Sequence, residues 1–200
     1  PPYQPSIAHY YDKYLLLISS SKAFSYAGQR VAALVISDSL YQARFPELKT
    51  RFGASQFGRA MIYGALYTLS AGVTHSAQYG MAGMLKAAND GEYNFVEGVR
   101  PYQEKAKRMK DIFTENGFQI VYDHDQEVPI ADGFYFTISY PDMDGAELLE
   151  RLLYYGISAI ALQTTGSERT EGLRACVSQV APEQFADLEK RVKAFHRDFS

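Results

Sequence analysis

The chain has 200 residues, of which 46% are hydrophobic and 22% charged, a composition typical of a protein that buries a hydrophobic core. The formal net charge is −3, and no segment carries the clustered basic residues that nucleic acids or anionic membrane surfaces require, so we expect neither partner. No apolar run is long enough to span a bilayer and no signal pattern opens the sequence, so the cytoplasm is the expected compartment.

Two short apolar runs stand near the start of the chain, at residues 14–18 and 31–36. Turn-forming residues flank both runs, and continuous apolar runs of this length are typical of strands that are buried on both faces of an α/β sheet. We therefore predict two fully buried strands. Lys22 follows the first of them, at its carboxyl end, where open α/β sheets bind their ligands.

The segment between these strands, residues 19–30, suits a phosphorylated aldehyde. It opens with Ser-Ser-Ser-Lys and closes on an arginine. The amine of Lys22 can attack a carbonyl carbon, whereas Ser19, Ser21 and Arg30 offer two hydroxyls and a planar set of N–H donors for a phosphate dianion. The alternative is that Lys22 is a surface lysine after a strand and that Arg30 forms an ordinary ion pair.

This Ser-x-Ser-Lys pattern, followed by a glycine and an arginine, resembles the fold-type-I pyridoxal-phosphate enzymes and, within them, the class I/II aminotransferases. The resemblance implies that Lys22 binds pyridoxal 5′-phosphate as an aldimine and that Ser19, Ser21 and Arg30 bind the cofactor phosphate. It also implies Tyr3 as the tyrosine that donates to the ring hydroxyl of the cofactor. The aspartate that pairs with the pyridine nitrogen in this family would precede the first residue of the chain.

The middle of the chain is predicted to be largely helical. Ser37, Asp38 and Ser39 are candidate caps for a short helix that Pro46 should end or kink, and residues 48–56 are predicted to be a charged connector. Apolar residues at helical spacing then predict helices over residues 57–69 and 76–88.

A loop of small residues, 70–76, separates these two helices. The free N–H groups at the start of the second helix favour an anion. In the family, the corresponding loop reaches the cofactor phosphate of the partner subunit, and the resemblance implies Thr74 for this contact. Helix capping explains Thr74 and Ser76 equally well, and His75 is a weaker candidate for a substrate contact.

The second half of the chain reads as an α+β unit. A long amphipathic helix is predicted over residues 95–116 and ends at Gly117. The elements predicted after it are strands over residues 118–122, 133–139, 157–162 and 173–180, a helix capped by Asp142 or Asp144 that ends at Gly156, and a final amphipathic helix that starts at Pro182.

This order resembles the small C-terminal domain of the aminotransferases. The resemblance implies an α/β fold in which residues 1–94 are the C-terminal part of the large domain, with its mainly parallel sheet, and residues 95–200 are the linking helix and the small domain. It also implies that Arg174 holds the α-carboxylate of the substrate in a bidentate fork. The alternative for Arg174 is an ion pair with a surface acid such as Glu168 or Glu171.

Two other segments contain residue types that occur in functional sites. Residues 123–127, Asp-His-Asp-Gln-Glu, offer oxygen ligands and an imidazole but lack the spacing of a calcium loop, so a solvated turn is the prediction and no metal is expected. Cys176, the only cysteine, excludes an internal disulfide framework and is predicted to be a small core residue.

The resemblance therefore identifies the chain as the C-terminal half of a pyridoxal-phosphate-dependent aminotransferase that acts on amino acids and 2-oxo acids. It further implies a homodimer and an N-terminal half that completes the enzyme. Three alternatives remain open: a lyase reaction such as β-elimination or α-decarboxylation on the same scaffold, a pyridoxal-phosphate-sensing domain of a transcription regulator, and an interaction fragment without cofactor.

Overall fold

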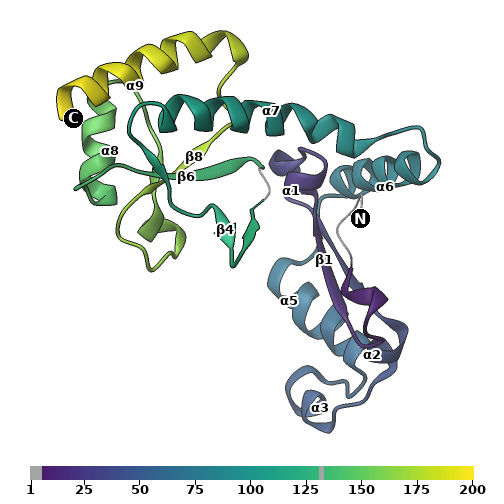
Figure 1. The fold of residues 1–200 in the computed structure, drawn as a ribbon. Helices are drawn as coiled ribbons and strands as arrows, with labels where there is room; N and C mark the ends of the chain where they lie inside the picture. Colours follow the sequence, from purple (N-terminus) through teal and green to yellow (C-terminus); the bar gives the residue numbers. More distant parts are fainter. Residues whose placement is uncertain (1–5, 131–132) are drawn as a thin grey trace. The chain divides into compact units, whose positions relative to one another are not determined.

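The computed structural model describes residues 6–130 and 133–200, so Tyr3 lies outside the described residues. The chain forms two compact units, Pro1–Gly98 and Val99–Ser200 (Figure 1). Helices and strands are mixed in both units, which gives the chain an α/β fold.

The strands of the first unit form a two-stranded antiparallel ribbon. Strands β1 (Leu15–Ser19) and β2 (Ala32–Ile36) pair from Leu15 opposite Ile36 to Ser19 opposite Ala32. The prediction that these strands are fully buried is wrong for this structure, because Leu17 is 76% exposed and no third described strand joins the ribbon. Both faces are apolar nevertheless, a pattern typical of strands that have cover on both sides.

The mainly parallel sheet expected for the large domain is likewise not present in residues 6–130 and 133–200, where all strand pairs are antiparallel. The physical reason is the connection between β1 and β2. It is 12 residues long and folds into two short turns of helix, so it returns the chain beside the strand it has just left instead of crossing to a parallel position.

Several helical segments follow one another along this unit. They include α1 (Ser20–Ala23), α2 (Asp38–Gln42), α3 (Pro46–Phe52), α4 (Phe57–Arg59), a π-helical stretch (Ala60–Leu66), α5 (Tyr67–Ser70) and α6 (His75–Asn89). Residues 57–70 thus form the helix predicted there, and α6 confirms the one that follows.

The region around Pro46 differs from the prediction. Ser37 caps α2 as expected, since its Oγ accepts a hydrogen bond from the amide of Leu40. Pro46, however, does not end a helix but begins α3, and this helix occupies most of the segment that was predicted to be a connector. Proline is well suited to a first helical position, where its missing N–H is not needed and its φ is already helical.

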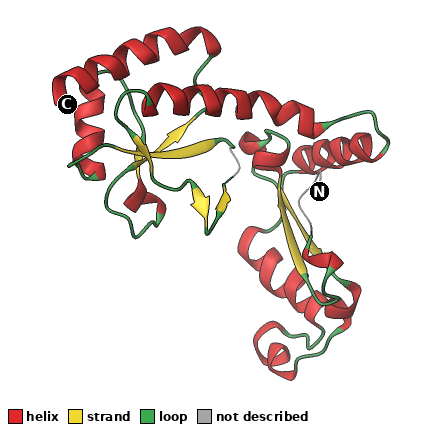
Figure 2. Ribbon diagram, in the orientation of Figure 1, coloured by secondary structure: helices red, strands yellow, loops and turns green. Residues whose placement is uncertain are grey.

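The second unit has a four-stranded antiparallel sheet in the order β3-β6-β8-β7. Its strands are β3 (Gln119–Ile120), β6 (Tyr135–Ser139), β7 (Ile160–Ala161) and β8 (Leu173–Cys176), and its helices are α7 (Phe95–Thr114), which begins in the first unit, α8 (Gly145–Tyr154) and α9 (Phe185–Phe199). Asp144 caps α8 and Gly117, at a φ of 81°, follows α7, both as predicted. Figure 2 shows this arrangement of strands and helices.

Residues from the three helices and from one face of the sheet form the core of the second unit. The fully buried members include Ile112, Phe113, Ile138, Leu148, Leu152, Leu173, Val192 and Phe195. Strands β7 and β8 are shorter than predicted, because regular pairing is limited to two residues of β7 and four of β8.

Residues 123–127 form a small hairpin rather than a metal loop. Strands β4 (His124–Asp125) and β5 (Val128–Pro129) pair across a turn in which Gln126 has a φ of 54°. Within the described ranges, no group of three or more His, Cys, Asp or Glu residues is placed to hold a metal ion. None of the described helices combines the length and the apolar character that crossing a membrane requires.

Glu189 joins α9 to α7. Its carboxylate accepts hydrogen bonds from Arg108 (Nη2 to Oε2, 2.8 Å) and from Lys193 on its own helix (Nζ to Oε1, 2.6 Å). The hydrogen bond and charge of Lys193, together with Arg108, hold the pKa of Glu189 below its ordinary value of 4.5. Because the pKa of Glu189 is lower in the folded than in the unfolded chain, its ionised carboxylate stabilises the fold at any pH above its pKa in the unfolded chain. This stabilisation is lost as the pH falls through the pKa of Glu189 in the folded chain.

We therefore expect Glu189→Gln to lower the free energy of unfolding near pH 7 and to leave it little changed near pH 3. Urea unfolding at the two pH values measures this difference. Glu150→Gln is the control, since Glu150 forms no ion pair with any residue that the structure describes. An equal effect of Glu189→Gln at both pH values would contradict the assignment.

Candidate active site

The turn between β1 and β2 is held in place by a buried serine and a small apolar cluster. The hydroxyl of Ser20, fully buried, donates to the carbonyl oxygen of Val31 at 2.5 Å and so ties the first residue of α1 to the start of β2. Phe24 and Val31 are buried with Met81 of α6. The turn is therefore part of the packed core of its unit.

The candidate residues of this turn lie at one end of the ribbon. Since Ser19 pairs with Ala32, the residues after Ser19 and those before Ala32 share that end. Ser19, Lys22 and Arg30 are exposed, and Ser21 is half-buried.

Arg30 lies at the entrance to β2 with an unusual backbone. Its φ is 53°, in the left-handed region that favours glycine, and its Nη1 donates to the carbonyl oxygen of Ala27 at 2.9 Å. It forms no ion pair among the described residues. A large side chain at such a φ is unfavourable, which favours a requirement for the guanidinium itself.

The charges of this end suit an anion. Between Asp12 and Asp38 the sequence contains no acidic residue, and Lys22 and Arg30 bring two positive charges to this turn. Two hydroxyls, an ammonium and a guanidinium form a donor set for a phosphate dianion. The residues present therefore fit a phosphorylated cofactor that is joined to a lysine.

Thr74 is the residue that precedes α6. It is exposed, and its side chain makes no capping hydrogen bond to the helix. Capping, one of the two explanations offered by the sequence, therefore does not account for the Thr74 side chain. His75 and Ser76, the first two residues of α6, are also exposed.

Arg174 lies on the face of the sheet opposite the hydrophobic core. In β8, Leu173 and Ala175 are buried in the core, so the alternation of a strand places Arg174 on the outer face. Its partners across the neighbouring strands are Thr137 of β6 and Ile160 of β7. Arg174 is therefore accessible from the outer face of the sheet. We define this outer face by Tyr135, Thr137, Ile160 and Arg174.

No carboxylate engages Arg174 within the described residues. Glu171, one of the acids considered from the sequence, pairs with Arg169 instead (Oε1 to Nε, 3.1 Å). The Nε of Arg174 is buried and has no hydrogen-bond partner among the described residues. An unpaired buried donor costs about 1–3 kcal/mol, a cost that a hydrogen-bond acceptor at this N–H would offset.

Cys176 differs from its prediction as a buried core residue. It is half-buried, and its Sγ lies 3.1 Å from the Oγ of Ser178. The last residue of β8 projects on the side away from the buried Ala175, and this explains its partial exposure.

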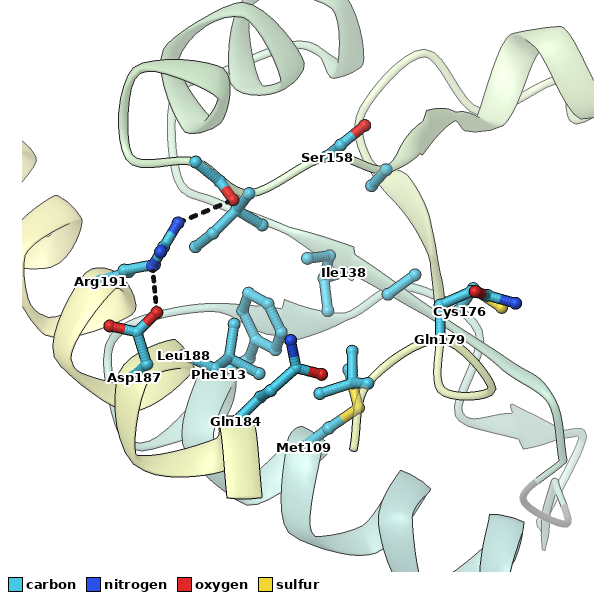
Figure 3. A pocket seen from close by; sticks show the side chains of 15 residues that line it. Met109, Phe113, Ile138, Ser158, Cys176, Gln179, Gln184, Asp187, Leu188 and Arg191 are labelled. Carbon is cyan, nitrogen blue, oxygen red and sulfur yellow. Dashed lines mark hydrogen bonds and ion pairs between the residues drawn. The ribbon is translucent and has the colours of Figure 1, made fainter. Parts of the chain in front are cut away.

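One cavity of the second unit is lined by Cys176 but not by Arg174. It has a volume of about 220 Å³ and lies between the core face of the sheet, α7 and α9 (Figure 3). Its charged groups are satisfied by one another, since Arg191 Nε contacts Asp187 Oδ2 at 2.7 Å and Arg191 Nη1 donates to the carbonyl oxygen of Gly156 at 3.1 Å. We therefore do not place the reaction there.

Sequence reasoning missed Tyr135. The alternation of apolar residues in β6 was visible, but its pairing with β8 was not, and this pairing brings the Tyr135 ring within 4.4 Å of the Arg174 guanidinium carbon. A register between strands that lie far apart in the sequence is a tertiary feature that a period-two pattern cannot specify.

A family model for aminotransferases of class I and II matches residues 4–192, nearly the whole chain. No protein with a curated function matches the sequence. Among solved structures, an aspartate aminotransferase variant from Thermus thermophilus is similar over 90% of this chain and 43% of its own length, with a TM-score of 0.65 and 16% identity.

Two further solved structures have related folds. An α-aminoadipate aminotransferase from Thermus thermophilus, complexed with N-(5′-phosphopyridoxyl)-L-leucine, matches 96% of this chain and 43% of its own, with a TM-score of 0.63 and 17% identity. An L-threonine-O-3-phosphate decarboxylase from Porphyromonas gingivalis matches 92% of this chain and 46% of its own, with a TM-score of 0.54 and 15% identity. The chain spans less than half the length of these proteins, and its fold matches part of the pyridoxal-phosphate transferase fold.

Proposed function

Because the chain belongs to the class I and II aminotransferases, we propose that it provides the lysine of an enzyme that transfers an amino group between an α-amino acid and a 2-oxo acid. The observation that carries this proposal is the end of the β1–β2 ribbon, which the strand register gives to Ser19, Ser21, Lys22 and Arg30 together. Pyridoxal 5′-phosphate, when bound there, supplies the electron sink for the chemistry.

The residues of the turn divide the work between binding and proton transfer. Lys22 holds the cofactor covalently through Nζ, and Ser19, Ser21 and Arg30 bind its phosphate. Once released from the cofactor, the Lys22 amine would accept the α-proton of the substrate and deliver it to the C4′ carbon of the cofactor. One side chain thus serves as general base and general acid.

Arg174 orients the substrate in this proposal. Its guanidinium binds the α-carboxylate through two N–H donors in one plane, which fixes the direction of the breaking C–H bond. The buried Nε without a partner and the absence of a carboxylate partner among the described residues support this role.

We further propose that additional protein covers the first unit. The chain spans 43% of the length of the Thermus aspartate aminotransferase, and the ribbon presents apolar residues on both faces, with Leu17 76% exposed. An N-terminal half that supplies neighbouring strands would cover them and would also contribute the aspartate that pairs with the pyridine nitrogen. Tyr3, in this chain, would donate to the ring hydroxyl of the cofactor. In a homodimer, Thr74 would reach the cofactor phosphate of the partner subunit.

Arg30→Ala should weaken cofactor binding without removing the covalent link. A lost charge-assisted hydrogen bond costs about 1.5–3 kcal/mol, so we expect the dissociation constant for pyridoxal phosphate to rise about 10- to 150-fold. Equilibrium dialysis followed by absorbance of the retained cofactor measures it. Gln29→Ala, an exposed neighbour in the same turn, is the control, and equal retention in the two variants would argue against Arg30 as a phosphate ligand.

The reaction type is tested by following nitrogen. The cofactor-loaded enzyme is incubated with a ¹⁵N-labelled amino acid and an unlabelled 2-oxo acid, and the products are analysed by mass spectrometry. The proposal predicts ¹⁵N in a new amino acid. Labelled ammonia would indicate elimination instead, and release of carbon dioxide would indicate a decarboxylase, the second candidate, which is the activity named for the Porphyromonas structure.

A further inference from the structure

The outer face of the second unit's sheet contains an aromatic ring against the candidate carboxylate-binding arginine. The Cζ atom of Arg174 lies 4.4 Å from the centre of the Tyr135 ring, within the distance of a strong cation–π contact. The two residues are diagonal neighbours, because Tyr135 pairs with Cys176 and Arg174 pairs with Thr137. Such diagonal neighbours on antiparallel strands are close enough for an aromatic ring to reach.

This contact leaves the donors of the guanidinium available. The Arg174 Cζ lies over the Tyr135 ring, and the N–H bonds of a guanidinium point outward within its own plane. The Nε is buried and has no hydrogen-bond partner among the described residues, so no neighbouring acceptor uses its N–H there.

The other neighbours do not hold the arginine. Thr137 lies directly opposite Arg174, but its Oγ1 accepts a hydrogen bond from the backbone N–H of Tyr122 at 2.9 Å. Ile160, opposite on the other side, has no polar group, and the nearby Glu171 is paired with Arg169. Among these neighbours, the side chain that contacts the guanidinium is therefore that of Tyr135.

We propose that Tyr135 is a positioning residue that sets the plane of the Arg174 guanidinium and so prepares it for a planar carboxylate. This inference rests on the proposed function of Arg174. The ring makes the contact with the guanidinium, so we expect phenylalanine to replace tyrosine in this role and an aliphatic residue not to.

The experiment uses the full chain and records the Nε–H resonances of its arginines by NMR during a titration with propanoate, a carboxylate without an amino group. The Arg174 resonance is identified by its loss in Arg174→Lys. Tyr135→Phe should leave the dissociation constant for propanoate unchanged, whereas Tyr135→Leu should raise it about tenfold, the loss expected for a partly desolvated cation–π contact.

The same variants are then compared in the cofactor-loaded enzyme. Tyr135→Leu should raise the KM for the amino acid by a similar factor while cofactor retention stays as in the unsubstituted protein. Equal propanoate binding by Tyr135→Leu and Tyr135→Phe would overturn the positioning role, as would loss of the folded sheet in Tyr135→Leu, which would make the ring a structural support. If the Arg174 resonance does not respond to propanoate in the unsubstituted chain, it is the role of Arg174 itself that fails.

Discussion

Lys22→Ala should abolish amino transfer by the cofactor-loaded enzyme. The substitution removes the covalent link to the cofactor and the group that moves the α-proton, and loss of a general acid–base group alone slows a reaction by about 10²- to 10⁴-fold. Steady-state turnover with a saturating amino acid and 2-oxo acid measures the effect. Added methylamine should restore part of the activity in Lys22→Ala, since a free amine can take the place of the missing side chain.

Two controls separate this effect from a loss of charge or fold. Lys22→Arg keeps the positive charge but cannot release a neutral amine, and we expect it to be as inactive as Lys22→Ala. Lys13→Ala removes a lysine two residues before β1 and should retain full activity. An active Lys22→Ala enzyme without added amine would contradict the assignment of Lys22.

The second large effect is expected for Arg174→Lys. Lysine keeps the charge but loses the planar fork, so one of the two hydrogen bonds to the α-carboxylate is lost. We expect kcat/KM for α-amino acids to fall about 10- to 150-fold, corresponding to about 1.5–3 kcal/mol, while cofactor binding is unchanged.

The loss in kcat/KM compared with the loss in cofactor affinity decides the role of Arg174. Arg169→Lys is the matched control, because Arg169 lies in the preceding loop and is engaged with Glu171. Arg169→Lys should change neither kcat/KM nor cofactor binding. Equal losses of turnover and cofactor binding in Arg174→Lys, or no loss of turnover, would show that Arg174 supports the fold and does not bind the substrate.

Local signals predicted much of the secondary structure. The apolar period of α7 and the left-handed glycines after α7 and α8 depend on neighbours within a few residues, and each was found where the sequence placed it. The cap of α8 is Asp144, one of the two aspartates predicted for it. Pro46 was misjudged because proline both ends helices and begins them, and the surrounding residues do not decide between the two.

Burial and strand pairing could not be predicted in the same way. The apolar runs of β1 and β2 indicate cover on both faces, but whether this chain provides that cover depends on strands elsewhere, and Leu17 is exposed among the described residues. The contact between Tyr135 and Arg174 depends on the register of β6 and β8. The candidate residues of the turn could be found from the sequence because they lie close together in it. Tyr135, the neighbour of Arg174, could not, because the two residues lie far apart in the sequence.

The most direct test of the central proposal is to locate the cofactor on the chain. Borohydride reduction of the cofactor-loaded protein fixes pyridoxal phosphate on the lysine that holds it, and peptide mapping by mass spectrometry then identifies that lysine. The account predicts a single modified peptide, with the label on Lys22, and no label in Lys22→Ala. Modification of another lysine in the unsubstituted protein, or labelling that persists in Lys22→Ala, would contradict it.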